Sequence, residues 1–422
     1  MFKEFISTSA LKKNFQKSLL VSSIALLAAC GSEDESSISN TEFSAITEDT
    51  VPAGFSFDSG VEATFYADEV YGPDERNVFD IFLPDSEEPT SLIIYVHGGG
   101  FFTGDKAAAY GTPEDINEVL DAGVAFATIN YSLLDVPGFN DAEANDTEGL
   151  GKSLSDVKEA LQYIRHNATE FNVDPENIAM YGVSAGAISS LWLAYSDDMA
   201  DESLGDTFNA SESTRIVAAG AIETQGSMDV VRWEEILAPI QVTLEIAAGL
   251  TLSLMESVYA IEASDATTSL ALMREETGDI ADFRATLDIP ALIDDQDPAV
   301  FVSNTEVEVN ATIAALTRLS EIQVAVPVLL EEISTALAED DVDTLTEKSG
   351  ELSALSTEGA SLAPGIIGAL LHFPTHPKAI VDAAEAAGAT VVANIPQLSL
   401  PEPTGQTVIP FLLEELGATP QP

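Results

Sequence analysis

The sequence predicts an α/β fold with a mostly parallel, doubly wound sheet of about eight strands. Two observations lead to this prediction. Short apolar runs of strand length alternate with amphipathic runs of helix length over residues 78–222, and a glycine-flanked serine lies at one strand-to-helix junction. Alternating strands and helices favour parallel strands that are joined by crossover helices on both faces of the sheet.

Each expected element has its own pattern. Residues 62–66 and 78–83 alternate between apolar and polar side chains, which predicts two initial antiparallel strands. The helix expected over 153–171 places Leu154, Val157 and Leu161 on one face. Apolar runs predict the later strands at 92–96, 124–129, 178–181, 216–222, 299–302 and 390–394, and further helices are expected at 377–388 and 408–416.

Two helical insertions, at about 233–290 and 306–371, interrupt this alternation. Pro327 is expected to separate two helices in the second insertion, because proline breaks the backbone ladder inside a helix. Both insertions leave from the carboxyl ends of strands, where open α/β sheets bind ligands. We therefore expect them to form a cap over an active site, and the alternative is scaffolding or a dimer surface.

The N-terminus has the pattern of a processing signal. Four lysines precede the apolar stretch 19–29, which is too short for a permanent membrane span. The run Leu27-Ala28-Ala29-Cys30-Gly31 resembles a bacterial lipoprotein signal, which implies cleavage after residue 29 and lipidation of Cys30. The alternative is an ordinary signal peptide with an incidental cysteine. Lipidation would anchor the protein to the bacterial cell envelope, at the outer membrane or the cell surface.

Composition restricts the rest of the chain. Cys30 is the only cysteine, which excludes a disulfide framework. Residues 30–50 are acidic and rich in serine, and we expect a tether there, followed by one large domain over 51–422. The chain carries 16 Lys and Arg against 71 Asp and Glu, a net charge of −55. Such a surface would repel nucleic acid and is typical of proteins in salty surroundings. No metal site and no phosphate-binding loop is predicted, so no cofactor is expected.

The run Gly182-Val183-Ser184-Ala185-Gly186 is the clearest chemical signal. An apolar strand run precedes it and a helical run follows, which is the context that a nucleophile elbow requires. Its glycines let strand and helix approach closely, while the turn strains the serine backbone. The hydroxyl of Ser184 would then lie at a helix N-terminus.

A second motif precedes the elbow. The buried-strand run at 92–96 leads directly into His97-Gly98-Gly99-Gly100-Phe101. A glycine-rich loop at this place can direct backbone N–H groups toward a developing oxyanion, which is usually the largest contribution to acyl-transfer catalysis. The two motifs together, each after a strand, predict acyl-transfer chemistry.

Residues 78–190 resemble the hormone-sensitive-lipase-type carboxylesterases and the feruloyl-esterase-like (BD-FAE-like) α/β hydrolases. The matching runs are 79–84 (FDIFLP), 97–101 (HGGGF), 130–133 (NYSL), 174–178 (DPENI) and 182–186 (GVSAG). The resemblance implies the α/β-hydrolase fold and ester hydrolysis through an acyl-serine intermediate on Ser184. It also implies an oxyanion hole formed by Gly99, Gly100 and Ala185, with His97 holding the loop.

The general base departs from the family pattern. Most α/β hydrolases carry it after the last strand, but no histidine follows residue 376 here. His166 is expected on the surface, which leaves His372 and His376. Either ring could reach Ser184 from the carboxyl end of the sheet. His376 precedes Pro377, so a helix N-terminus would lower its pKa and suit a base, although a capping role is equally possible. His372 could equally be a packed loop residue.

The acid of the triad has several candidates. Glu306 lies closest to the usual position, just after the seventh expected strand. Glu223 and Asp229 follow the sixth strand and are the alternative. Three further aspartates precede the seventh strand and would lie at its wrong end: Asp294, Asp295 and Asp297.

Two functions therefore compete. The first is a serine carboxylesterase that acts on a small or medium ester with an apolar part. The second is an inactive hydrolase-fold lipoprotein that serves as a binding or scaffold protein. The complete elbow and glycine loop favour the enzyme, and the lack of a histidine after the last expected strand favours the scaffold.

Overall fold

The computed structural model describes residues 50–137, 149–204, 209–240, 242, 244–263, 265–304, 309–400 and 405–418. The predicted signal peptide, Cys30 and nearly all of the tether lie outside these residues. The described chain divides into two compact units. The smaller unit holds residues 246–251 and 309–373, and the larger unit holds the remaining described residues.

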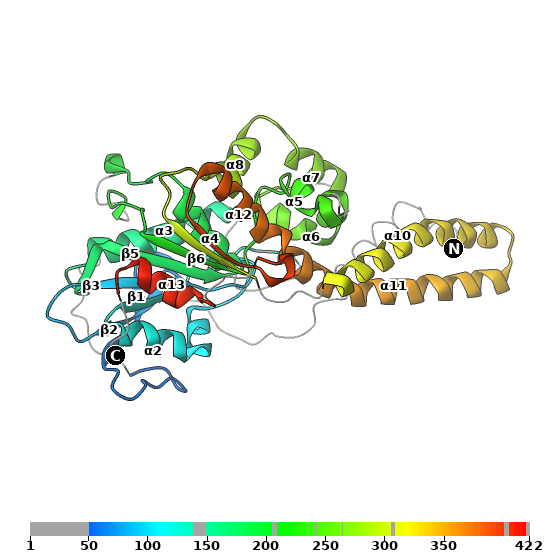
Figure 1. Cartoon of the computed structure of the whole chain (residues 1–422). Helices are drawn as coiled ribbons and strands as arrows, with labels where there is room; N and C mark the ends of the chain where they lie inside the picture. The colour runs from blue at the N-terminus through cyan, green and yellow to red at the C-terminus, as the bar shows by residue number, and fades with distance from the viewer. Residues whose placement is uncertain are drawn as a thin grey trace. The chain divides into compact units, whose positions relative to one another are not determined.

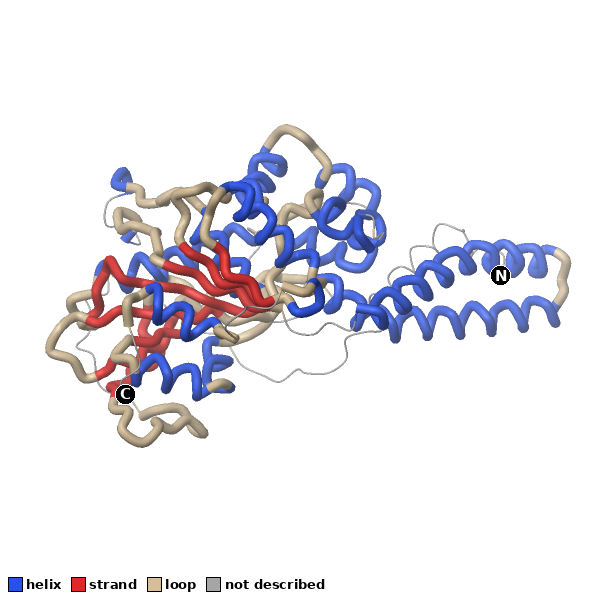
Figure 2. The backbone as a smooth tube through the Cα atoms, viewed as in Figure 1, coloured by secondary structure: helices blue, strands red, loops and turns tan. Residues whose placement is uncertain are grey.

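The larger unit is built on an eight-stranded sheet in the order β1-β2-β4-β3-β5-β6-β7-β8 (Figures 1 and 2). The strands are β1 (Ala63–Val70), β2 (Val78–Pro84), β3 (Thr90–Val96), β4 (Ala125–Ile129), β5 (Val173–Val183), β6 (Ala218–Ile222), β7 (Ala299–Ser303) and β8 (Val391–Asn394). β1 and β2 pair antiparallel, as do β2 and β4, and the other pairs are parallel. The predicted α/β-hydrolase fold with a mostly parallel sheet is confirmed.

Helices cover both faces of this sheet (Figure 1). On one face, α2 (Pro113–Asp121) and α13 (Val408–Glu415) bury Ile116 and Leu412 against Phe82 of the sheet. On the other face, Tyr163 of α3 (Leu150–His166) contacts Phe79, with ring centroids 6.0 Å apart. α3 ends five residues before the predicted boundary, where the backbone turns at Asn167. The burial of these apolar side chains stabilises the unit by roughly 1.5–3 kcal/mol for each large side chain.

Successive strands are added to one side of β3 as far as β4 and to its other side from β5 onward. β3 lies between β4 and β5, and its last residue Val96 pairs with Gly182 of β5. The glycine loop after β3 and the elbow after β5 therefore lie at neighbouring carboxyl ends. This is a topological switch point, where α/β sheets place their ligand crevice.

Among the described residues, five α-helices lie between β6 and β7, in agreement with the helical character predicted for the first insertion: α5 (Trp233–Leu237), α6 (Leu244–Val258), α7 (Ala266–Met273), α8 (Asp279–Leu287) and α9 (Ile289–Leu292). Capping residues mark where individual helices of this insertion begin. Asp265 caps α7 by accepting hydrogen bonds from the N–H groups of Thr267 and Thr268, and Gly278 with φ 97° precedes α8. A capping role for these helices over the active site stays a prediction.

The smaller unit is an antiparallel hairpin of α10 (Val309–Ala338) and α11 (Val342–Leu371). The predicted break at Pro327 is wrong, because α10 continues through it. Buried apolar side chains on both sides of the proline, such as Ile322 and Leu329, hold the helix together. The chain instead turns at Asp340, whose φ is 53°, and Asp341 caps α11.

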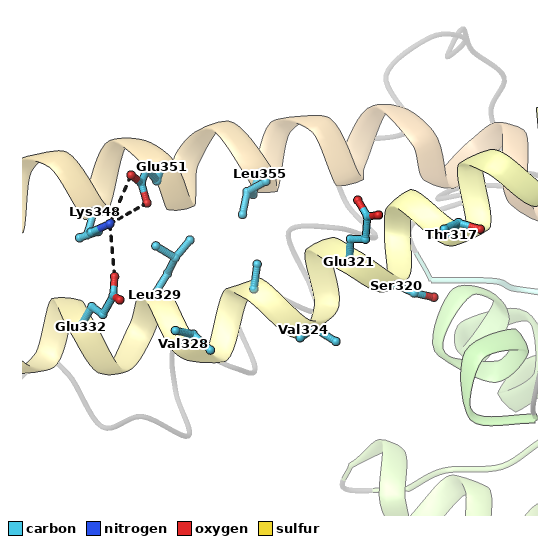
Figure 3. A pocket seen from close by; sticks show the side chains of 11 residues that line it. Thr317, Ser320, Glu321, Val324, Val328, Leu329, Glu332, Lys348, Glu351 and Leu355 are labelled. Atoms are coloured by element: carbon cyan, nitrogen blue, oxygen red, sulfur yellow. Dashed lines mark hydrogen bonds and ion pairs between the residues drawn. The ribbon is translucent and has the colours of Figure 1, made fainter.

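A groove of about 730 Å³ runs along this hairpin (Figure 3). Val324, Val328 and Leu355 line it, and Lys348 pairs with Glu332 and Glu351 at one end. By length and composition alone, α10 and the stretch 342–387 could each cross a membrane, and 28% of the most apolar window of α10 is buried. The core helix of a soluble protein meets the same criterion, so these properties do not place either helix in a bilayer.

Candidate active site

Ser184 occupies a sharp turn between β5 and α4 (Ala185–Tyr195). Its backbone has φ 54° and ψ −111°, a region that residues with a side chain rarely adopt. The N–H of Ser184 donates to the carbonyl of Ile222 over 2.9 Å, and its own carbonyl accepts from the N–H of Ile188 over 3.0 Å. These two bonds hold the strained residue between the sheet and the first turn of the helix.

The flanking glycines are sterically required. A Cβ atom on Gly186 would collide with the carbonyl oxygen of Val96, and one on Gly182 would lie 2.6 Å from the same oxygen. Real Cβ atoms essentially never come this close to other heavy atoms. The glycines therefore allow β3, β5 and α4 to meet at the elbow.

The loop after β3 lies directly against the elbow. A Cβ atom on Gly98 would be 2.8 Å from the carbonyl oxygen of Val183 and 3.5 Å from the Cβ of Ser184. Gly99 and Gly100 follow with φ of 114° and 64°. Within the described part of the chain, no backbone carbonyl accepts from the N–H of Gly99 or Gly100. Both groups therefore have donor capacity in the loop whose Gly98 lies against Ser184, as an oxyanion hole requires.

The side chain of His97 bonds to the backbone of this loop. Its fully buried ring lies 2.7 Å from the carbonyl of Gly98 through Nδ1, and it stacks on Tyr131 with centroids 4.3 Å apart. The Tyr131 hydroxyl donates to the carbonyl of His97 over 2.9 Å. Arg76 donates to the carbonyl of Gly104 and lies 3.4 Å from Nε2 of His97. Burial lowers the pKa of His97 to about 4, so the ring is neutral at pH 7 and serves as a fixed hydrogen-bonding group.

The loop after β6 contacts the elbow from the other side. The side-chain amide of Gln225 donates to Oγ of Ser184 over 3.4 Å. The next residue, Gly226, donates its backbone N–H to Nδ1 of His376 over 3.1 Å. Gln225 is not among the predicted site residues. Its one sequence signal is its position, two residues after Glu223 at the carboxyl end of a central parallel strand.

His376 is fully buried as the second residue of α12 (Thr375–Ala387). Its ring packs edge-on against Trp233, with centroids 5.4 Å apart. Because a backbone N–H is always a donor, Nδ1 must accept from Gly226, and the neutral ring carries its proton on Nε2. A base that takes the serine proton through Nε2 needs the opposite tautomer. The observed arrangement is therefore not that of an assembled triad.

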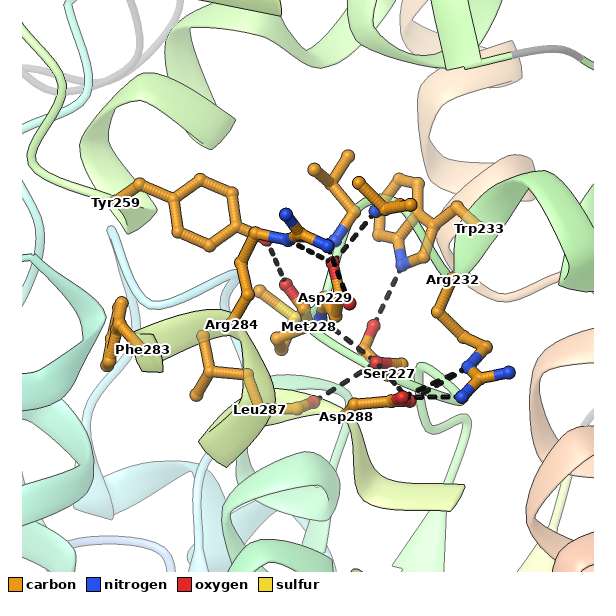
Figure 4. A network of polar contacts seen from close by, with 12 residues as sticks. Ser227, Met228, Asp229, Arg232, Trp233, Tyr259, Phe283, Arg284, Leu287 and Asp288 are labelled. Atoms are coloured by element: carbon orange, nitrogen blue, oxygen red, sulfur yellow. Dashed lines mark hydrogen bonds and ion pairs between the residues drawn. The ribbon is translucent and has the colours of Figure 1, made fainter. Parts of the chain in front are cut away.

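A polar network fixes the loop after β6 to α8 and to Asp288, the residue between α8 and α9 (Figure 4). Ser227 donates through Oγ to the carbonyl of Leu287 over 3.1 Å, and its own carbonyl accepts from Nε1 of Trp233 over 2.8 Å. Two ion pairs flank these bonds. Arg284 pairs with Asp229 at 2.7 Å, and Arg232 pairs with Asp288 at 2.6 Å. Asp229, an alternative triad acid, is thus engaged by Arg284.

The remaining predicted residues fall into three groups. His166 is exposed on α3 and lies 3.1 Å from Glu212, which matches the expected surface position. His372 ends α11 in the smaller unit, so its distance to Ser184 is not defined. Glu306 lies outside the described residues.

The other acidic candidates lie at opposite ends of the neighbouring strands β6 and β7. Glu223 follows β6 with φ 55°, and its N–H donates to the carbonyl of Ser303 over 2.9 Å. The three aspartates before β7 lie at the amino end of that strand, away from the elbow, as expected: Asp294, Asp295 and Asp297. Among the described residues, no group of three His, Cys, Asp or Glu side chains could hold a metal ion.

Comparison with known proteins agrees with this geometry. Residues 79–268 match the BD-FAE family model. A chlorogenic acid esterase from Aspergillus niger is 27% identical over 175 residues, which cover 42% of this chain and 31% of that enzyme. A para-nitrobenzyl esterase from Bacillus subtilis (strain 168) is 30% identical over 116 residues, which cover 26% of this chain and 22% of that enzyme.

A solved structure of a truncated carbohydrate esterase from gut microbiota aligns with a TM-score of 0.48 and 15% identity, over 86% of this chain and 99% of the other. The chain spans less than a third of the length of the two relatives named above. The sheet order and the elbow are those of an α/β-hydrolase fold, and residues 79–268 are similar to the BD-FAE family model.

Proposed function

We propose that the protein is a carboxylic-ester hydrolase that uses Ser184 as its nucleophile. The strained backbone of Ser184 carries this proposal, because it holds the side chain on an elbow between a glycine-rich loop and a helix N-terminus. Strain of this size costs of order 1–3 kcal/mol and persists mainly where function requires it. The esterases among the relatives support the same reaction class.

In the proposed reaction, Oγ of Ser184 attacks the ester carbonyl carbon while a base takes its proton. The carbonyl oxygen becomes an oxyanion, which accepts hydrogen bonds from the N–H groups of Gly99, Gly100 and Ala185. The C–O bond to the alcohol then breaks, the alcohol leaves with the proton, and an acyl-serine remains. Water, deprotonated by the same base, attacks this ester and releases the acid.

His372 and His376 are the two candidates for the base. For His376 to act, the proton on Nε2 must first move to Nδ1, which requires the bond from Gly226 to break or the ring to turn. His372 belongs to the helical hairpin, so its ring is not placed relative to Ser184. Glu306 stays the proposed acid partner, with Glu223 as the alternative.

We further propose a small or medium ester with an apolar acyl or aryl part as the substrate. The net charge of −55 disfavours strongly anionic esters by long-range repulsion. Lipidation of Cys30 is proposed to anchor the enzyme to the membrane of the bacterial cell envelope. Globomycin-sensitive processing and loss of metabolic palmitate labelling in Cys30→Ser would test that anchor.

The deciding experiment measures hydrolysis of p-nitrophenyl butyrate by the wild type and by four folded alanine variants. These are Ser184→Ala, His372→Ala, His376→Ala and the control His166→Ala. Loss of turnover and of fluorophosphonate labelling is expected for Ser184→Ala, and loss of turnover for one of the two candidate histidines. His166→Ala should equal the wild type because its ring is exposed on α3. A folded wild type that neither turns over esters nor reacts with the fluorophosphonate would contradict the proposal.

A further inference from the structure

We infer that Gln225 is a positioning residue for the nucleophile: its side-chain amide holds Oγ of Ser184 in place and supports the charge that this oxygen carries during the reaction. The inference rests on the proposed esterase function and adds a residue to the same site. It starts from the 3.4 Å contact between Nε2 of Gln225 and Oγ of Ser184.

The direction of this hydrogen bond matters. An amide N–H can only donate, so Oγ of Ser184 accepts through a lone pair and this bond does not use the proton of the hydroxyl. The contact thus fixes the rotation of the hydroxyl without competing for the proton that must leave. A carbonyl in the same place would instead take the serine proton and hold it away from the base.

Gln225 is held firmly enough to position another group. Only 4% of the residue is exposed, and its backbone carbonyl accepts from the hydroxyl of Thr224 over 2.8 Å. On the next residue, a Cβ atom would lie 2.6 Å from the carbonyl oxygen of His376, so Gly226 fits tightly against α12. On the preceding side, the N–H of Glu223 donates to the carbonyl of Ser303. The amide is therefore presented from a loop that is fixed on both sides.

The network beyond this loop adds to its rigidity. Ser227 and Met228 both bond to the carbonyl of Leu287 on α8. The contact of Gln225 with Ser184 is thus supported by residues that never touch the nucleophile. Rigid support of this kind is what keeps a reacting atom within a fraction of an ångström of its productive position.

The chemistry predicts which kinetic constant should respond. Oγ gains negative charge twice, when it loses its proton during attack and when it leaves during hydrolysis of the acyl-serine. A donor that already points at Oγ stabilises both transition states more than the bound ester. Loss of the donor should therefore lower kcat and kcat/KM together and leave KM nearly unchanged.

The test compares Gln225→Met with Gln225→Glu in the full-length protein, using p-nitrophenyl butyrate. Gln225→Met keeps the shape but removes the donor, and we expect kcat to fall roughly tenfold or more. Gln225→Glu introduces a carboxyl group that donates only while protonated. The plot of its kcat against pH should show an additional decrease as pH rises through the pKa of that carboxyl, because an ionised carboxylate repels the developing charge on Oγ.

Gln162→Met is the matched control. Gln162 is also buried and also donates through its amide, to the carbonyls of Ala210 and Glu212, but it lies on α3 away from the elbow. This variant should lose stability and keep the kcat and the pH profile of the wild type.

Two results would overturn the positioning role alone while the wild type stays active. One is a kcat for Gln225→Met within about twofold of the wild type with an unchanged pH profile for Gln225→Glu. The other is a fall of kcat in Gln162→Met that equals the fall in Gln225→Met. That result would mean that both glutamines affect kcat only through the stability of the fold. A wild type without turnover or fluorophosphonate labelling would instead overturn the esterase function itself.

Discussion

The backbone N–H of Gly226 donates to Nδ1 of His376 over 3.1 Å, and this single bond fixes the tautomer of a candidate base. The neutral ring then carries its proton on Nε2, so this nitrogen can donate a hydrogen bond but cannot accept one. His97 shows the opposite arrangement. Its Nδ1 lies 2.7 Å from the carbonyl of Gly98, an acceptor, so the proton must lie on Nδ1.

These opposite tautomers can be measured directly. Long-range nitrogen–proton NMR on protein labelled with ¹⁵N-histidine should show Nε2 protonated in His376 and Nδ1 protonated in His97 at neutral pH. His97→Asn and His376→Asn would assign the two sets of signals. An Nδ1-protonated His376 would mean that the bond from Gly226 is absent in solution, and the ring would then have the tautomer of a catalytic base.

Gly186→Ala should disrupt the elbow. The added methyl group would collide with the carbonyl oxygen of Val96 and push β3 away from α4. Overpacking against backbone costs typically 1–3 kcal/mol, so we expect about 3 kcal/mol of lost stability together with loss of turnover. Urea unfolding monitored by circular dichroism measures the first effect.

Gly350→Ala is the control for that substitution. Gly350 lies inside α11, where an added Cβ atom would meet nothing within 4 Å. Alanine is favoured over glycine in a helix, so this variant should gain roughly 0.5–1 kcal/mol. If Gly186→Ala unfolded at the same urea concentration as the wild type, the close approach at the elbow would be refuted.

Much of the architecture could be predicted from the sequence because strands and helices leave different periodicities. All eight strands of the sheet overlap predicted runs, although β5 (Val173–Val183) is much longer than the predicted 178–181, and the elbow and glycine loop meet at adjacent strand ends. Pro327 shows the limit of local rules. A proline usually ends a helix, but the apolar side chains of α10 pack against α11 on both sides of it, and this tertiary packing outweighs the local cost.

The loop after β6 could not be predicted for a related reason. Gln225 has no motif around it, and its importance comes from contacts with Ser184, 41 positions away in the sequence. The tautomer of His376 depends on Gly226, which is 150 positions away. Long-range contacts of this kind are decided by packing, and no local sequence pattern records them.

The stability of the protein should depend on pH through His97. Burial lowers the pKa of this ring to about 4, whereas an unfolded histidine titrates near 6.5. Between these values the unfolded chain binds the extra proton, so the folded state is fully favoured above about pH 6.5 and loses up to about 3 kcal/mol as pH falls to about 4. The oxyanion loop rests on this ring.

A difference measurement isolates this effect from the titration of the many carboxylates. In His97→Asn the introduced amide can still donate to Gly98, but it does not titrate. The free energy of unfolding should therefore fall less steeply for the variant than for the wild type between pH 6.5 and 4. If the free energy of unfolding fell equally steeply with pH in the wild type and the variant, the pKa of His97 would not be lowered in the folded state.

Salt should stabilise the protein. A net charge of −55 repels itself most strongly in the compact state, and added salt screens that repulsion beyond about 10 Å at 0.1 M and about 3 Å at 1 M. The urea midpoint should therefore rise between 0.05 and 1 M sodium chloride. Sucrose at matched osmolality is the control, and an equal rise with sucrose would argue against electrostatic screening.

The ion pair between Arg284 and Asp229 should matter for both stability and turnover. Both side chains are nearly buried, with 12% and 11% exposed, and the pair helps to fix the loop that presents Gln225. Removing one partner of a buried pair costs about 3–5 kcal/mol, and partial exposure places Arg284→Met near the lower end of that range. Any displacement of the loop would also lower kcat.

Arg274→Met is the matched control, because its pair with Glu234 is exposed at 39% and 46% and exposed pairs contribute roughly 0–1 kcal/mol. The comparison uses the free energy of unfolding and kcat at a temperature where both variants are folded. A larger loss for Arg284→Met in both quantities would show that the loop after β6 depends on α8. If Arg284→Met lost stability while kcat stayed at the value of the wild type, the network would stabilise the fold without positioning the nucleophile.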